Sequence, residues 1–238
     1  MGRRLTAPGP EAAPPPPPPA AGGLLPREFF DRTALEVAPG VLGCVLRHET
    51  DDGPVAVTIT EVEAYLGAVD PASHSFRGRT ARNAVMFGDP GHAYVYFTYG
   101  MHWCVNLVCL PPGIPEAVLL RAGRVTEGVP LAAARRQAGR APGRTPAKSP
   151  AERDLARGPA RLCQALAIDR AQDGADVCDA GSPLQVLAPG GPMPPAAISR
   201  GPRVGISRAT EEPWRFWITG DPTVSAYRPH VPKRRAPA

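Results

Sequence analysis

The sequence predicts an α+β fold: a single domain with a mostly antiparallel, curved β-sheet and peripheral helices. Three observations support this prediction. The expected strands come in runs, and the helical segments are set apart from them, as in α+β domains. Hydrophobic residues make up 43% of the 238 residues, more than a wholly disordered chain carries. Although the chain has 32 prolines and 25 glycines, many of them gather in a few segments and leave room for one core.

Those segments set the expected domain boundaries. Residues 1–23 contain the run Pro14–Pro19 and are expected to form a disordered proline-rich tail. Residues 137–151 are rich in proline, glycine and basic side chains and are expected to be a flexible insertion, and residues 229–238 a basic tail. The folded domain is therefore expected over residues 24–228.

The domain is expected to begin with helical turns and a hairpin. Leu24–Arg32 and Thr33–Leu42 are typical of short helices, and Gly43 stops the second. Strands are expected over Cys44–Glu49 and Val55–Tyr65, with a turn between them. Strict alternation puts six side chains of the second strand on one face: Val55, Val57, Ile59, Glu61, Glu63 and Tyr65. Because an unpaired inward carboxylate is costly, the acidic end of this row needs partners or a function.

The remaining elements follow a long loop, Gly67–Gly91, which has little hydrophobic periodicity. Structureless loops of this length are usually functional or disordered. Helices are expected over Val129–Arg136 and over Pro159–Ile168, which has a proline at its start. The further strands are expected near His92–Phe97, Trp103–Leu110, Ala117–Val125, Leu184–Leu187, Arg203–Ile206 and Trp214–Ile218.

Aromatic residues cluster in the middle of the chain. Eight of the 14 lie between Tyr65 and Trp103. Tyr94 and Tyr96 share one strand face, and Tyr99 precedes Gly100, where the chain must turn, so Tyr99 is expected at a hairpin tip. Aromatic rings favour strands, and most such runs are core, which is also the expectation for Tyr94 and Phe97. A tyrosine at a turn beside an arginine-rich loop can instead stack on nucleic acid bases.

Composition narrows the classes of chemistry. The net charge of +5 permits a polyanionic partner without requiring one. Five cysteines without CxxC spacing indicate neither a disulfide framework nor a zinc site, which favours a reducing cytoplasm, and Cys104 and Cys109 are expected to be core thiols. The histidines lack metal-binding spacing, there is no P-loop, and no apolar stretch approaches a membrane span of about 18 residues. Glu61 and Glu63 share a strand face, whereas the two carboxylates of a glycosidase flank the scissile bond from different elements. This difference argues against an enzyme that cleaves carbohydrates.

A series of short motifs resembles the alkyladenine (3-methyladenine) DNA glycosylase family, in its bacterial form. The similarity spans Leu24–Tyr227 and implies a fold like the formyltransferase C-terminal domain. The motifs are Glu61-Val-Glu-Ala-Tyr-Leu-Gly67, His74-Ser75, Arg82-Asn83, Met86-Phe87, Tyr94-Val-Tyr96, Tyr99-Gly-Met101, Asn106, Val118-Leu-Leu-Arg-Ala122, Arg200-Gly-Pro-Arg-Val-Gly205 and Trp214-Arg-Phe.

The resemblance implies a base-excision repair enzyme. Such an enzyme flips alkylated or deaminated purines (3-methyladenine, 7-methylguanine, hypoxanthine class) out of duplex DNA and hydrolyses the N-glycosidic bond, which leaves an abasic site. By this resemblance Glu63 is the general base that activates water, and Arg121 and the Val204 carbonyl hold that water. We assign Glu61 to a structural salt bridge.

The resemblance also assigns the substrate contacts. Tyr65 and Tyr96 would stack on the flipped base, with His74 on the pocket wall. Asn106 would crowd the 2-amino group of guanine, the donor that distinguishes G·C pairs in the minor groove.

The DNA contacts follow in the same way. Tyr99 matches the intercalating wedge that replaces the flipped nucleotide, with Met101 beside it. Arg77, Arg79 and Arg82 are candidates for phosphate contacts, which position an enzyme without reading sequence.

The near absence of lysine bears on the product. A bifunctional glycosylase needs a lysine or terminal amine for a Schiff base, and both lysines, Lys148 and Lys233, fall in expected disordered segments. We therefore expect a monofunctional enzyme without abasic-site lyase activity, needing no cofactor and no metal. We also expect a cytoplasmic, nucleoid-associated monomer whose partner is double-stranded DNA with damaged purines, with no membrane association.

One alternative is a non-catalytic module that binds damaged or single-stranded nucleic acid. Such a module would use the basic and aromatic residues but would not need Glu63, Arg121 and Asn106.

Two departures from the family pattern bear on substrate preference. His102 stands where mammalian members have an aromatic residue, and Phe76 replaces a smaller or polar residue.

Overall fold

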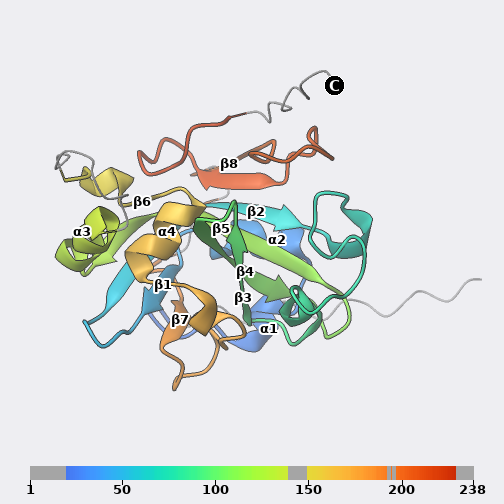
Figure 1. Cartoon of the computed structure of the whole chain (residues 1–238), viewed down its shortest axis with the longest axis horizontal. Helices are drawn as coiled ribbons and strands as arrows, with labels where there is room; N and C mark the ends of the chain where they lie inside the picture. The colour runs from blue at the N-terminus through green and yellow to red at the C-terminus, as the bar shows by residue number, and fades with distance from the viewer. Residues whose placement is uncertain (1–19, 139–148, 192–193, 195–196, 229–238) are drawn as a thin grey trace, which may run out of the picture.

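A long antiparallel sheet forms the framework of the computed structural model, which describes residues 20–138, 149–191, 194 and 197–228 (Figure 1). Six strands follow the order β3-β4-β5-β2-β1-β7, β6 pairs with β5, and β9 pairs with β2 and β8. All these pairs are antiparallel. The strands are β1 (Val45–His48), β2 (Val55–Tyr65), β3 (Ala93–Thr98), β4 (His102–Cys109), β5 (Glu116–Glu127), β6 (Ala156–Arg157), β7 (Leu184–Leu187), β8 (Ile198–Gly201) and β9 (Arg215–Ile218).

Four short α-helices of the described residues pack around the sheet, which confirms the predicted single-domain α+β fold. They are α1 (Arg27–Phe30), α2 (Ala34–Val41), α3 (Val129–Ala138) and α4 (Pro159–Leu166). Helix α2 begins at a capping box in which the Thr33 amide donates to Glu36 Oε2 at 3.0 Å, a local interaction that fixes the helix start. Among the described residues no helix is long and apolar enough to cross a membrane.

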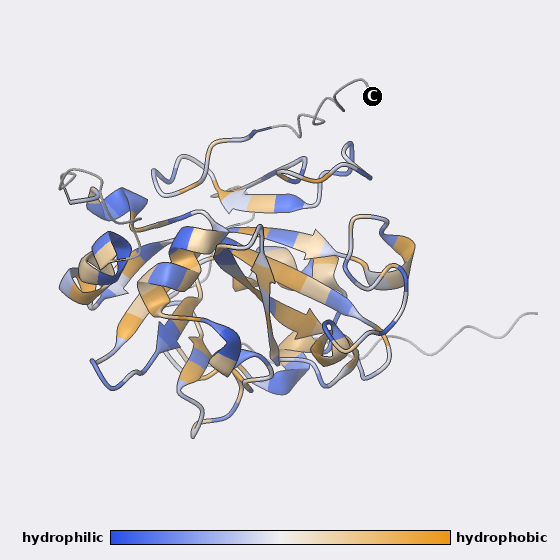
Figure 2. Cartoon of the chain, in the orientation of Figure 1, coloured by the Kyte–Doolittle hydropathy of each residue, from blue (hydrophilic) through white to orange (hydrophobic). Residues whose placement is uncertain are grey.

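The sheet has two different faces. Apolar side chains alternate along β3, β4 and β5 onto one face, where they join α2 and α4 in the main hydrophobic core, and these strands are largely apolar in Figure 2. The opposite face carries a small second cluster of Met86, Tyr94, Val108 and Ala117. The side chains between the core residues of these strands are therefore free to line a site.

Strand β2 changes face halfway along its length. Its pairing with β5 shifts register between Ile59 and Glu61 and again between Glu61 and Val62. The core row passes from Ile59 to Val62 and Ala64, so strict alternation through Glu61 and Glu63 is wrong. The extra residue of a β-bulge reverses the faces. The carboxylates are nonetheless buried, on the side opposite the main core.

Three further expectations need correction or completion. The strand expected at Arg203–Ile206 is absent, and β8 lies just before it, at Ile198–Gly201. Phe97 was expected in the core, but 44% of it is exposed. Helix α3 continues to Ala138, within the range expected to be an insertion, and residues 149–151 are also described. Residues 1–19, 139–148 and 229–238 of the expected tails and insertion lie outside the described residues.

The segment Gly67–Gly91 is a loop, as predicted, with two 3₁₀ turns at η1 (Gly67–Val69) and η2 (Ala84–Phe87). A buried asparagine organises its middle. Asn83 donates from Nδ2 to the carbonyls of His74 and Gly78 at 3.0 Å each, and its Oδ1 accepts from the Thr80 amide at 2.6 Å. This side chain therefore joins three positions of the loop and fixes the conformation of its middle.

Candidate active site

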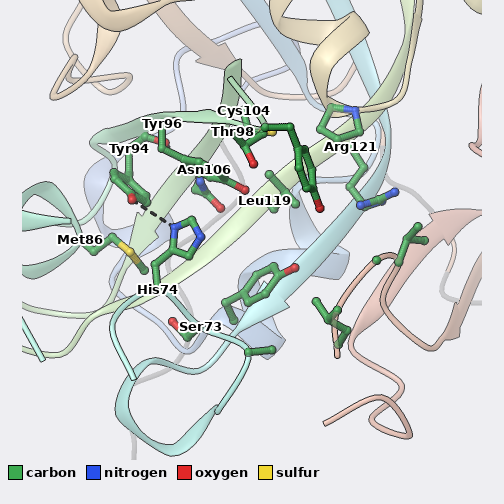
Figure 3. Close-up of a pocket in the computed structure, with 17 residues that line it drawn as sticks. Ser73, His74, Met86, Tyr94, Tyr96, Thr98, Cys104, Asn106, Leu119 and Arg121 are labelled. Atoms are coloured by element: carbon green, nitrogen blue, oxygen red, sulfur yellow. Dashed lines mark hydrogen bonds between the residues drawn. The ribbon is translucent and has the colours of Figure 1, made fainter. Parts of the chain in front are cut away.

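A cavity of about 230 Å³ opens on the face of the sheet away from the main core (Figure 3). Tyr94 and Tyr96 on β3, Cys104 and Asn106 on β4, and Leu119 and Arg121 on β5 alternate with core residues and face it. The loop after β2 and the segment after β8 complete the wall. The other lining residues are Tyr65, Ala72, Ser73, His74, Met86, Thr98, Tyr99, Pro159, Val204, Gly205 and Ile206. Clefts for drug-sized ligands measure about 300–1,000 Å³, so this cavity suits a smaller group.

Glu63 lies directly behind the cavity wall and has no exposed surface. Its Oε1 accepts a 2.7 Å hydrogen bond from the Val204 amide and lies 3.2 Å from Arg121 Nη1. Its Oε2 accepts a 2.9 Å hydrogen bond from the Tyr65 hydroxyl. All three partners line the cavity. Donors to both oxygens keep the carboxylate in one orientation. The Val204 contact comes from the amide, whereas the resemblance pointed to the carbonyl.

Arg121 connects Glu63 to a second buried carboxylate. Its Nε donates to Glu61 Oε1 at 2.8 Å, and Arg215 Nε donates to the same oxygen at 2.8 Å. Ser225 adds its amide to Glu61 Oε2 at 2.7 Å and its hydroxyl to Oε1 at 2.9 Å. Glu61 therefore forms the structural salt bridge that the sequence predicted.

Charge pairing decides the ionisation of this network. Burial alone would raise the pKa of Glu61, but Arg121 and Arg215 outweigh it and hold the pKa below its ordinary value. Burial would likewise lower the pKa of Arg121, but Glu63 and Glu61 raise it. Arg121 therefore stays a fixed cation at the cavity wall.

Tyr65 is held from behind by a buried arginine. The Arg203 guanidinium lies 4.6 Å from the centroid of the Tyr65 ring and 4.9 Å from that of Trp214. Arg203 also donates to the Ala64 carbonyl at 3.0 Å and forms a buried ion pair with Asp70. Burial, with Glu63 beside it, raises the pKa of Tyr65, so its hydroxyl stays protonated.

The opposite wall is a group of stacked rings. Tyr94 and Tyr96 stack with centroids 5.4 Å apart, and the His74 ring meets Tyr96 edge-on at 4.5 Å. The His74 Nδ1 lies 3.2 Å from the Tyr94 hydroxyl, the dashed line in Figure 3. Partial desolvation and the Arg82 charge lower the pKa of His74, which favours the neutral imidazole.

Asn106 and Cys104 point into the cavity from β4 (Figure 3). Asn106 donates from Nδ2 to the Tyr94 carbonyl at 3.2 Å, which fixes its amide. The Cys104 thiol lies against Tyr96, and burial raises its pKa. Cys104 and Cys109 are both buried and free, as predicted, although Cys104 also lines the cavity.

The hairpin between β3 and β4 places two large side chains at the cavity mouth. Tyr99 and Gly100 have φ values of +52° and +67°, and the Met101 amide donates to the Thr98 carbonyl at 3.2 Å. Two positive φ values define the type I′ hairpin turn. Tyr99 is 81% exposed and Met101 67%. Tyr99 therefore lies at a hairpin tip, as the sequence predicted.

The three arginines of the loop lie on the exposed surface, but they differ in the contacts that their side chains make. Arg82 Nη2 donates to the Phe97 carbonyl at 3.1 Å, and its guanidinium lies 5.8 Å from the centroid of the Tyr96 ring. In the described part of the chain, Arg77 and Arg79 make no side-chain hydrogen bond or ion pair. The structure thus brings Arg82 to the pocket wall and leaves the other two facing solvent.

Sequence reasoning missed the groups that support the site. Asp70 and Arg203 are separated by 133 positions, and Glu61 is linked to Ser225 across 164. The sequence signals that could have pointed to the first pair were an acidic residue in the loop and an arginine inside the Arg200–Gly205 motif. Of the residues assigned to the pocket, Tyr65, His74, Tyr96, Asn106 and Arg121 line one cavity, and Glu63 stands behind it. Within the described residues, no group of three or more His, Cys, Asp or Glu side chains could hold a metal ion.

Comparison with known proteins gives a consistent result. The family model described as methylpurine-DNA glycosylase matches residues 28–222. A relative from Streptomyces avermitilis, named "Putative 3-methyladenine DNA glycosylase", is 55% identical over 213 residues, which cover 89% of this chain and 95% of the relative. A relative with the same name from Leifsonia xyli subsp. xyli is 52% identical over 86% of this chain and 92% of the relative. Another from Methanocella arvoryzae is 43% identical over 87% of this chain and 98% of the relative.

Proposed function

The chain belongs to the methylpurine-DNA glycosylase family, and from that premise we propose that it is a monofunctional 3-methyladenine DNA glycosylase. Its substrate would be double-stranded DNA with alkylated or deaminated purines, of the 3-methyladenine, 7-methylguanine and hypoxanthine class. The enzyme flips the damaged nucleotide into the cavity and hydrolyses its N-glycosidic bond, acting as a cytoplasmic, nucleoid-associated monomer. The small, aromatic cavity beside a buried carboxylate supports this proposal.

Glu63 is proposed to take a proton from the attacking water. The water oxygen forms a bond to C1′ of the deoxyribose while the bond from C1′ to the purine nitrogen breaks, and the base leaves with the bonding electrons. Arg121, whose Nη1 lies 3.2 Å from Glu63 Oε1, is proposed to help hold that water, and the Val204 segment closes the other side. General base catalysis of this kind contributes about 10²–10⁴-fold to rate.

The pocket supplies selectivity through its rings. Tyr65 and Tyr96 are proposed to stack on the flipped base, since a π face attracts cationic N-alkylated purines. His74 and Asn106 contact the base edge. Because Asn106 is fixed by the Tyr94 carbonyl, its side chain cannot easily move aside for an exocyclic 2-amino group.

The exposed hairpin tip supports base flipping. Tyr99 fills the space left by the extruded nucleotide, with Met101 against the neighbouring pair, as apolar wedges of minor-groove proteins do. The solvent-facing Arg77 and Arg79 are suited to phosphate contacts.

The observation that carries the proposal is the set of three hydrogen-bonding and charged partners around Glu63. Replacing Glu63 with Gln should lower base release by at least about 100-fold while binding to lesion-bearing duplex persists. Release is measured on oligonucleotides with single lesions, and binding by fluorescence anisotropy. Unchanged release in the variant would contradict the role of Glu63. A wild-type protein that binds lesions without releasing any base would favour the non-catalytic module instead.

A further inference from the structure

Arg121 is shared between two buried carboxylates, and its shorter contact is to the one without a role in the proposed reaction. Its Nε donates to Glu61 Oε1 at 2.8 Å, whereas its Nη1 lies 3.2 Å from Glu63 Oε1. Neither carboxylate has exposed surface, and Arg121 lines the cavity. The arginine beside the proposed general base is therefore held most closely by another group.

A bulge in the sheet creates this arrangement. Glu61 of β2 lies opposite Ala122 of β5, and the next residue of β2, Val62, lies opposite Leu120. One residue of β5 between them, Arg121, is left without a partner on β2. Bulges next to active sites re-aim side chains. Here the unpaired residue directs its guanidinium to both carboxylates of β2.

Further donors hold Glu61 from the C-terminal side of the chain. Arg215 Nε donates to its Oε1 at 2.8 Å, and Ser225 donates its amide to Oε2 at 2.7 Å and its hydroxyl to Oε1 at 2.9 Å. Arg121 Nη2 also donates to the Ser225 hydroxyl at 3.5 Å. Burial opposes ionisation, but the two arginines hold the pKa of Glu61 below its ordinary value, so Glu61 is a carboxylate near neutral pH.

The charges around Glu63 come from few groups. Burial raises the pKa of the neighbouring Tyr65, Tyr96 and Cys104, so these groups stay protonated and neutral. Arg203, behind Tyr65, is paired with Asp70. Among the described residues, the remaining charges of this network are those of Glu61, Arg121 and Arg215.

These charges bear on the base directly. A nearby cation favours the ionised form of a carboxylate, whereas a general base must accept a proton in the reaction. Arg121 acting on Glu63 alone would therefore oppose the proton transfer while orienting the carboxylate. Stability is a weak explanation for Glu61, because a buried ion pair often stabilises no more than apolar residues of similar volume.

We propose that Glu61 is a positioning residue for the reaction: it orients Arg121 and takes up part of its positive charge, so that Arg121 fixes Glu63 and still lets it act as a base. The kinetic consequence rests on the proposed glycosylase function, but the restraint on Arg121 does not.

The pH dependence of base release tests the charge. The substrate is duplex DNA with 7-methylguanine, which is cationic in the nucleotide and leaves without a general acid. Glu61→Gln keeps the shape of the side chain but removes its charge, so the acidic limb of the profile should move to lower pH by about one unit. Arg215→Gln removes a cation from the same network and should move the limb to higher pH. A limb that stays in place in both variants would overturn the proposal.

The maximal rate tests the orientation. Ser225→Ala keeps every charge but removes one hydroxyl, so the maximal rate should fall by about threefold to tenfold while the acidic limb stays in place. Lesion binding should persist, because Ser225 does not line the cavity. Ser199→Ala is the matched control, since that hydroxyl bonds Thr219 Oγ1 at 2.8 Å on the exposed surface, and it should change neither quantity. An unchanged rate in Ser225→Ala would contradict the positioning.

A measurement without DNA separates this proposal from the proposed function. In the full chain with ¹⁵N-labelled arginine, the Nε–H signal of Arg121, identified by its absence in Arg121→Lys, should exchange slowly with water. Exchange should be faster in Glu61→Gln and Ser225→Ala and unchanged in Ser199→Ala. If the wild type shows this pattern but releases no base, the proposed function fails and the restraint on Arg121 stands. Equal exchange in the wild type and in both network variants would overturn the restraint, whatever the activity.

Discussion

The guanidinium of Arg203 and the carboxylate of Asp70 form a bidentate ion pair, with distances of 2.5 Å and 2.9 Å, in which neither side chain is exposed. The pair joins the loop after β2 to the segment after β8. Arg203 also stacks on the Tyr65 ring, and the next residue, Val204, donates its amide to Glu63. One buried pair therefore fixes two of the three partners of the candidate general base.

Removing the Asp70 charge should destabilise the whole domain. Asp70→Asn leaves a buried guanidinium without its counter-ion, and breaking such pairs costs about 3–5 kcal/mol. Denaturant unfolding of the variant should show this loss. Glu49→Gln is the matched control, because the Arg47–Glu49 pair is exposed and such pairs contribute at most about 1 kcal/mol. A loss below 1 kcal/mol in Asp70→Asn would show that the buried pair does not hold the segment.

Glu61 should make stability depend on acidity. Its pKa is held below the ordinary value in the folded state, so it stabilises the fold above its unfolded pKa of about 4.3. That contribution is lost as pH falls through the lower folded value. The difference in unfolding free energy between wild type and Glu61→Gln should therefore be largest near pH 6 and should narrow below about pH 4. A difference that stays constant across this range would mean that Glu61 is not ionised in the fold. Glu127→Gln, which removes an exposed pair with Arg47, should change stability little at any pH.

Local patterns predicted the fold and the faces of most strands, whereas the residues assigned to the pocket came from the resemblance to the family. Alternation along β3, β4 and β5 is a period-two signal, so the sequence places Tyr94 and Tyr96 on one face, and Gly100 marks the turn that exposes Tyr99. In β2 the same rule failed after Ile59, because a bulge adds one residue and no sequence feature marked it.

The support behind the pocket depends on contacts between distant segments. Arg203 pairs with Asp70 and Ser225 with Glu61 only after the segments that follow β8 and β9 fold onto β2. No periodicity connects such positions, and the motif around Arg203 was expected to be a strand. Sequence reasoning therefore identified the groups facing the cavity better than those that position them.

The reaction product should be an intact abasic strand. Within the described residues there is no lysine near the cavity, since Lys148 and Lys233 both lie outside them. β-Elimination proceeds through a Schiff base to an amine, and no described residue beside the cavity supplies one. Purified protein should release the base but leave the strand uncut until alkali is added. Strand cleavage without alkali, together with a protein–DNA adduct trapped by borohydride, would show a bifunctional enzyme.

Tyr99 should combine a cost in stability with a gain in function. Its φ of +52° lies in the left-handed region, which costs a residue with a Cβ about 1–2 kcal/mol. Tyr99→Gly relieves that strain but adds freedom to the unfolded chain, so we expect it to be as stable as wild type or up to about 1 kcal/mol more stable. Tyr99→Ala is the matched control, because it also lacks the ring but keeps the strain, and it should gain no stability.

Both variants should lose base release from duplex DNA while retaining more of it on a single-stranded substrate, where no base pair must be broken. Equal losses on the two substrates would place Tyr99 in base binding instead, and a Gly variant less stable than the Ala variant would show that the turn is not strained.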